Sequence, residues 1–62
     1  MPKILIEFDI DNAAFEDLPM MESARILRHL AREINETGFV NGDIAVRDIN
    51  GNVVGRARLI ED

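Results

Sequence analysis

Hydrophobic and polar residues alternate along the first ten positions of the chain. The apolar set is Ile4, Ile6, Phe8 and Ile10, and the intervening set is Leu5, Glu7 and Asp9. Because successive side chains of a strand point to opposite faces, this alternation predicts a strand over residues 3–10 with one buried face. The polar segment that follows contains two helix-capping residues, Asp11 and Asp17, and predicts a short helical turn that folds Phe15 onto the core.

The longest periodic segment runs from residue 19 to residue 37. Pro19 lies in its first turn and Gly38 follows its last residue, which are typical signals for the start and the end of a helix. Apolar residues recur at intervals of four and three: Met20, Ala24, Leu27, Ala31 and Ile34, widened by Ile26 and Leu30. The pattern predicts an amphipathic helix that packs through this stripe, with its charged face, from Glu22 to Glu36, in solvent.

The last third of the chain predicts a β-hairpin centred on Asn50-Gly51, the strongest short hairpin signal. A two-residue type I′ turn places Ile44, Val46, Val53, Gly55, Ala57 and Leu59 on a core face, and Ala45, Arg47, Ile49, Val54, Arg56, Arg58 and Ile60 on the other face. A three-residue turn with Gly51 in the left-handed conformation is the alternative. It would bury Arg56 and Arg58 without partners, which is costly, so the two-residue turn is preferred.

These elements predict one α+β domain over residues 1–62, with the order β-α-β-β and one helix packed on one face of a three-stranded sheet. If the first strand lies beside the third, the sheet is antiparallel throughout. If it lies beside the second, a right-handed parallel crossover is needed. We favour the antiparallel arrangement, although the sequence leaves the strand order open.

A chain of 62 residues has a small core, and such chains usually add disulfides, a metal or a partner subunit. The chain has no cysteine, which excludes disulfides and thiolate metal sites. A second copy of the chain is therefore expected to stabilise the small core, and we predict a homodimer. The second face of the hairpin and the first strand offer the candidate interface: Leu5, Arg47, Ile49, Val54, Arg56, Arg58 and Ile60.

The chain carries seven basic and twelve acidic residues, a net charge of −5, which opposes non-specific binding to nucleic acid. Three arginines, Arg25, Arg28 and Arg32, nevertheless form a stripe on the predicted helix and are the candidate partner-binding residues. A small nucleic-acid-binding regulator that uses arginines of the helix or the hairpin is the alternative function. The N-terminal apolar run is too short for a signal peptide or a membrane span, so a cytoplasmic protein is expected.

Sequence motifs for catalysis or metal binding are incomplete in this chain. His29 is the single histidine and has no nucleophile on its helix face. Two segments begin like calcium loops, at Asp9 and at Asp48, but both lack the glycine at the sixth position and the glutamate at the twelfth. We therefore predict turn and capping roles for these carboxylates, with no catalytic residue, cofactor or metal.

Several short stretches together resemble a widespread group of short proteins encoded by bacteriophages and prophages, which has no assigned activity. These stretches are Glu7-Phe8, Asn12-Ala13-Ala14-Phe15-Glu16, Ala24-Arg25-Ile26-Leu27 with Leu30-Ala31, and Asp48, Asn50-Gly51-Asn52 and Val54-Gly55. The resemblance transfers no site residue. It implies a bacterial host cell as the setting, and a non-catalytic protein that binds a host protein such as a CRISPR-type defence component.

Overall fold

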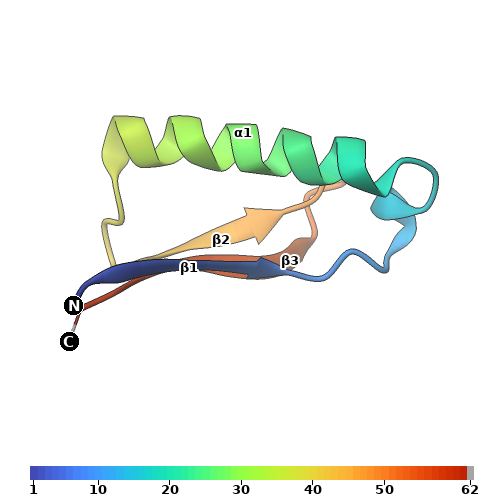
Figure 1. The fold of residues 1–62 in the computed structure, drawn as a ribbon. Coiled ribbons are helices and arrows are strands. Elements are labelled where there is room, and N and C mark those ends of the chain that lie inside the picture. Colours follow the sequence, from blue (N-terminus) through green and yellow to red (C-terminus); the bar gives the residue numbers. More distant parts are fainter. Residues whose placement is uncertain (62) are drawn as a thin grey trace.

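The computed structural model describes residues 1–61, and it has one helix packed on a three-stranded sheet (Figure 1). The elements are β1 (Lys3–Phe8), the short 3₁₀ helix η1 (Ala13–Phe15), α1 (Pro19–Thr37), β2 (Asp43–Arg47) and β3 (Val53–Ile60). The bounds of α1 agree with the prediction, and Gly38 ends the helix with a φ of 70°. β1 ends two residues earlier than predicted, because the chain turns away after Asp9 toward η1.

The sheet has the order β1-β3-β2 and is antiparallel throughout, which confirms the predicted arrangement. Ala57 lies at its centre, opposite Ile6 of β1 and Ile44 of β2. Gly55 lies between Phe8 and Val46 in the same way. Since residues directly opposite one another share a face, these positions form the face of the sheet that carries the core.

The hairpin turn differs from the two-residue turn predicted from Asn50-Gly51. The N–H of Asp48 donates to the carbonyl oxygen of Asn52 at 2.9 Å, which leaves three residues in the turn, and Gly51 alone among them has a positive φ, 86°. A type I′ turn needs a positive φ at Asn50 as well, and no described residue other than glycine has one. The alternative turn is therefore the one that forms.

An irregularity just after the turn restores the predicted register of the hairpin. Arg47 lies opposite Val53, whereas Val46 lies opposite Gly55, so β3 has one extra residue at this point. This bulge turns Val54 toward the core and leaves Val53 exposed, the reverse of the prediction. Beyond the bulge, Ala57 faces the core while Arg56 and Arg58 face away, as predicted.

The core lies between α1, η1 and the β2 side of the sheet. It consists of Phe15, Ile26, Leu30, Ile44, Val46 and Ala57. The rings of Phe8 and Phe15 stack with their centres 6.4 Å apart, which joins the end of β1 to η1. The helix contributes Ile26 and Leu30 to this core, which lie at the side of the predicted stripe, whereas Leu27 at its centre is exposed.

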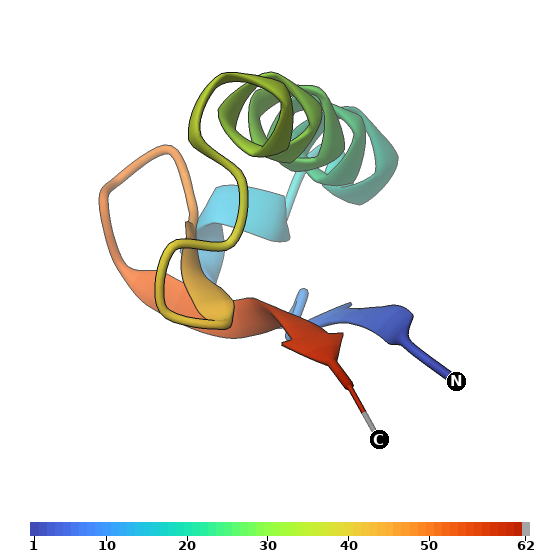
Figure 2. The same cartoon turned by 90° about the vertical axis from the view of Figure 1, so that its left-hand side faces the viewer.

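The two layers diverge from β2 toward β1. Viewed along α1, the sheet rises toward the helix at β2 and falls away from it at β1 (Figure 2). Ile4 and Ile6 therefore remain exposed, although both lie on the face of the sheet that carries the core. The prediction that this face of the first strand is buried holds at Phe8, which packs against the core, and is wrong at Ile4 and Ile6, because the single helix covers the β2 side of the sheet.

Candidate functional site

An uncovered apolar surface lies on the helix side of the sheet. It is formed by Ile4 and Ile6 of β1 and by Leu27 of α1, and we call these three residues the helix-side surface. Their exposed fractions are 54%, 37% and 47%. Single exposed apolar residues are ordinary in folded proteins, but three on the side of the sheet that carries the core indicate an unfinished layer.

The position of Leu27 follows from the two flanks of the helix. His29 and Glu33 lie on one side of the line through Ile26 and Leu30, and they line a surface depression together with residues of β2. At 100° per residue, Leu27 lies on the opposite side of that line. It therefore points away from the free edge of β2, toward the side of the sheet that ends in β1.

The size of the molecule agrees with an incomplete layer. The solvent-accessible surface is 4613 Å², whereas a compact monomer of 7.0 kDa has about 4,000 Å². The radius of gyration is 12.1 Å, compared with about 10.6 Å for a compact chain of this length. The excess is about 600 Å² in a molecule whose principal extents are 38 × 21 × 17 Å.

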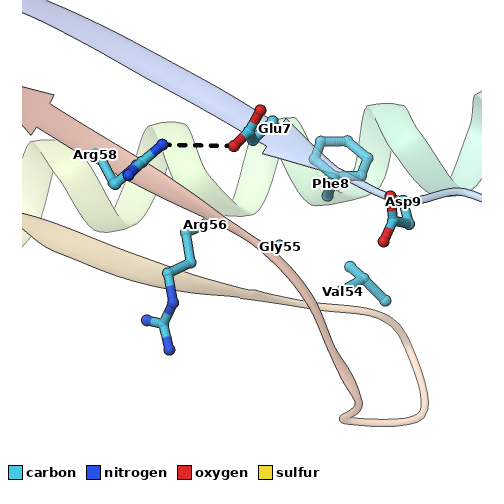
Figure 3. A pocket seen from close by; sticks show the side chains of 7 residues that line it. All are labelled: Glu7, Phe8, Asp9, Val54, Gly55, Arg56 and Arg58. Carbon is cyan, nitrogen blue, oxygen red and sulfur yellow. Dashed lines mark hydrogen bonds and ion pairs between the residues drawn. The ribbon is translucent and has the colours of Figure 1, made fainter.

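The opposite face of the sheet carries charges of both signs. Arg56 lies 3.5 Å from the carboxylate of Asp43, and Arg58 lies 3.5 Å from that of Glu7. Figure 3 shows the Arg58 side chain directed along the sheet to Glu7, at the margin of a depression of about 480 Å³. Each arginine thus has a carboxylate nearby, so this face presents mixed charge and not a basic patch for phosphates.

The structure keeps four of the seven residues predicted to form the interface on one face of the sheet and moves Val54 and Ile49 away from it. Leu5 and Ile60 lie with Arg56 and Arg58 on the outer face of the sheet, and Arg47 lies at the end of β2. Val54 packs toward the core, and Ile49 is exposed in the turn beside the start of α1. The bulge and the three-residue turn, which the alternation alone does not indicate, cause this separation.

The predicted arginine stripe on the helix is also divided. Arg25 donates from Nε to Glu22 Oε1 at 2.7 Å and from its terminal nitrogen to Glu22 Oε2 at 3.0 Å. This two-point contact occupies the guanidinium. Arg28 and Arg32 are exposed and have no such contact, so they are the two residues of the stripe whose guanidinium groups are not held by Glu22.

A polar cluster anchors the hairpin turn, with the buried carboxylate of Asp48 at its centre. Asp48 Oδ1 accepts hydrogen bonds from the backbone N–H groups of Asn50 and Asn52, both at 2.9 Å. Asp48 Oδ2 accepts from the side-chain amides of Asn12 at 2.8 Å and Asn52 at 3.3 Å. Asn12 also caps η1 by accepting from Ala14 N–H, so one carboxylate connects the turn to the segment before the helix.

Glu22 forms the second half of this cluster and was predicted to face solvent. Its side chain is 8% exposed, and Oε2 accepts a hydrogen bond from the backbone N–H of Ile49 at 2.8 Å. The bond joins the first turn of α1 to the hairpin turn. The sequence signal for this cluster is the polar run Asp48-x-Asn50-x-Asn52, which predicts a turn role for Asp48 and does not indicate its contact with Asn12.

Both carboxyl groups of the cluster are stabilised in their ionised forms. The guanidinium of Arg25, with help from the Ile49 N–H, holds the pKa of Glu22 below its ordinary value, although burial acts in the opposite direction. Burial by itself raises the pKa of Asp48, but the hydrogen bonds from Asn52, Asn12 and Asn50 together outweigh it, and the pKa is lowered. The contact with Glu22 raises the pKa of Arg25.

These pKa shifts predict a loss of stability in acid. Because both folded-state pKa values are lowered, the stabilisation is complete above the unfolded-state values, near about 4, and is lost as the pH falls through the folded-state values. The urea midpoint, followed by far-UV circular dichroism, should be constant from pH 7 to about 5 and fall steeply below that. Glu22→Gln should flatten this decline and Glu36→Gln, at an exposed position, should not; equal slopes for all three proteins would contradict the assignment.

No family model, curated protein or solved structure matches the chain. The resemblance to phage and prophage proteins therefore stays a prediction, and the candidate site rests on the geometry of this chain alone.

The remaining polar residues of the range 1–61 include no group of three or more metal-binding side chains. No helix in that range is long and apolar enough to cross a membrane. His29 is exposed and lies 3.6 Å from Glu33, and the hydroxyl of Thr37 donates to the Glu33 carbonyl oxygen at 3.1 Å. The absence of a catalytic residue, which the sequence predicts, stays a prediction.

Proposed function

We propose that this chain is a non-catalytic protein-binding module that works as a homodimer. The observation that carries the proposal is the helix-side surface: Ile4, Ile6 and Leu27 remain exposed beside the core, in a molecule with about 600 Å² more surface than a compact chain of its mass. A second copy can cover part of this area, and a partner protein can cover the rest. Both are ordinary ways for a small domain to complete its core.

The proposal also concerns the kind of partner that the module binds. The resemblance to phage-encoded proteins supports a host protein in the bacterial cytoplasm, such as a CRISPR-type defence component, whose activity the module inhibits or modulates. Two features of the surface favour a protein over nucleic acid. The outer arginines have carboxylates within 3.5 Å, and the net charge of the chain is −5.

Two measurements test this proposal. Sedimentation equilibrium over a wide concentration range should give a mass of about twice 7.0 kDa. The immobilised protein should retain a host protein from a lysate, and Leu27→Asp should abolish that retention while leaving the fold unchanged, because a buried carboxylate at an apolar contact is costly. Val40→Asp, at an exposed loop position, is the matched control and should retain the host protein.

Two outcomes would count against the proposal. A wild-type protein that stays monomeric at every concentration would contradict the proposed homodimer. If the wild-type protein and Leu27→Asp retained the host protein equally well, the helix-side surface would not be the site of partner binding.

A further inference from the structure

β1 is an edge strand with exposed apolar residues and an unpaired backbone edge. It pairs with β3 on one side only, and Figure 2 shows it at the margin of the sheet. Ile4, Leu5 and Ile6 in its centre are all exposed. Natural proteins usually protect such edges with charges, prolines or bulges, because an exposed apolar edge pairs readily with another strand.

Two hydrogen bonds identify the backbone groups at this free edge. The N–H of Asp9 donates to Val54 O at 3.0 Å, and the N–H of Leu59 donates to Gly42 O at 2.9 Å. Residues of an antiparallel strand bond alternately to one side and to the other. The odd-numbered residues of β1 therefore bond to β3, and the N–H and C=O groups of Ile4, Ile6 and Phe8 point to the free edge.

The sequence of β1 is complementary to itself around Leu5. When a second copy is placed antiparallel with Leu5 on the two-fold axis, Leu5 faces Leu5, Ile4 faces Ile6, and Lys3 faces Glu7. Each pair joins residues of the same face. Ile4 and Ile6 meet on the helix side of the sheet, and the Leu5 pair and the oppositely charged Lys3 and Glu7 lie on the outer face. Ile4 and Ile6 are also the residues whose edge groups can exchange hydrogen bonds. Pro2, which lacks an N–H, would end the ladder.

We propose that the free edge of β1 pairs antiparallel with β1 of a second copy, with Leu5 on the two-fold axis, to form one continuous sheet. This inference deepens the proposed function, since it rests on the homodimer and assigns its interface. The helices of both copies lie on the same face of the joined sheet. The two helix-side surfaces then meet at the centre, where Ile4 and Ile6 of both copies form one apolar floor for a partner protein.

The free edge of β2 is the competing surface, and it fits less well. Pairing around Ala45 would also place opposite charges together, Asp43 with Arg47. However, Ile44 and Val46 are already buried beneath α1, so this pairing would remove little apolar surface from water. The gain from association scales with the apolar area buried, which favours β1.

Amide hydrogen exchange of the wild-type protein tests the interface without any substitution. The N–H groups of Ile4 and Ile6 should become protected as the protein concentration rises, whereas that of Ala45, at the β2 edge, should not. The N–H groups of Leu5 and Glu7 bond to β3 in either state and serve as internal references. Protection that rises at Ala45 and not at Ile4 and Ile6 would overturn the inference.

Two matched substitutions separate the edges by sedimentation equilibrium. Leu5→Glu replaces an apolar pair on the two-fold axis by two carboxylates and should weaken the dimer by about tenfold. Ala45→Glu makes the same change at the other edge and should leave the dimer unaffected. Both new carboxylates lie opposite an arginine of β3, Arg58 or Arg56, so both variants should fold.

A charge exchange tests the register. Lys3→Glu and Glu7→Lys should each weaken the homodimer, because like charges then lie opposite one another. An equimolar mixture of the two variants should form a heterodimer, in which opposite charges face one another again. A mixture that associates no better than either variant alone would contradict the register.

The possible outcomes distinguish this inference from the proposed function. A dimer that survives Leu5→Glu and dissociates with Ala45→Glu would overturn the β1 interface and leave the homodimer standing. A wild-type monomer at every concentration would overturn both.

Discussion

Gly55→Ala is expected to detach β1 from β3 and to destabilise the domain by about 4 kcal/mol or more. A methyl group at this position would lie 2.5 Å from Phe8 Cα and 2.6 Å from Phe8 Cβ, and closer still to the carbonyl oxygen of Glu7. These atoms belong to or adjoin the backbone of the neighbouring strand, so they can retreat only if the strands separate. A domain of 62 residues has a total stability of about 3–9 kcal/mol, so the substitution should remove roughly half of that stability or more.

Gly51→Ala is the matched control for this prediction. Gly51 has a φ of 86°, which costs a residue with a side chain about 1–2 kcal/mol, but nothing lies within 4 Å of the added methyl group. Urea unfolding followed by far-UV circular dichroism suits both variants, because the chain has no tryptophan or tyrosine for fluorescence. If Gly55→Ala were no less stable than Gly51→Ala, the close approach of β1 to Gly55 would be wrong.

Asp48→Ala is expected to lower the melting temperature by more than about 10 °C. The substitution removes the acceptor for two backbone N–H groups and for the side-chain amides of Asn12 and Asn52. Asp48 is only 4% exposed, so water cannot readily replace the lost bonds. Among residues 1–61, no buried side-chain polar atom lacks a partner in the native structure, whereas in this variant the side-chain amide of Asn12 loses its acceptor Asp48 Oδ2.

Asp48→Asn distinguishes the charge from the shape of the side chain. Its amide oxygen can still accept from the N–H groups of Asn50 and Asn52, but its NH₂ group would meet the donating amide of Asn12. The variant should therefore be less stable than wild type and more stable than Asp48→Ala. Asp43→Ala, at a half-exposed strand position with a 3.5 Å ion pair, should change the melting temperature by only a few degrees. A melting temperature of Asp48→Ala within a few degrees of wild type would contradict the anchoring role of the cluster.

Local signals in the sequence were sufficient to predict the helix and the strands. The proline in the first turn and Gly38 after the last one mark α1, whose bounds are as predicted. Period-two alternation identifies β1, and a glycine that can adopt a positive φ marks the hairpin turn at Gly51. Each of these depends on the conformational preferences of a few neighbouring residues, which the sequence contains in full.

The turn shows where local reasoning stops. The sequence left two turns open, and the cost of burying Arg56 and Arg58 favoured the two-residue form. The protein satisfies the same requirement differently, with a three-residue turn followed by a bulge at Val53 and Val54. The buried carboxylate of Asp48 stabilises that turn, and its partner Asn12 is 36 positions away in the sequence.

Which part of the helix stripe is covered was decided only by the tertiary structure. Periodicity shows that α1 has a wide apolar stripe, but it contains no information about where the helix lies on the sheet. The bond from Ile49 N–H to Glu22 and the packing on Phe15 hold the helix over β2, so Ile26 and Leu30 are buried while Leu27 is exposed. The sequence by itself determined the elements and their antiparallel hairpin. The uncovered surface beside β1 arises from long-range contacts, which no local pattern encodes.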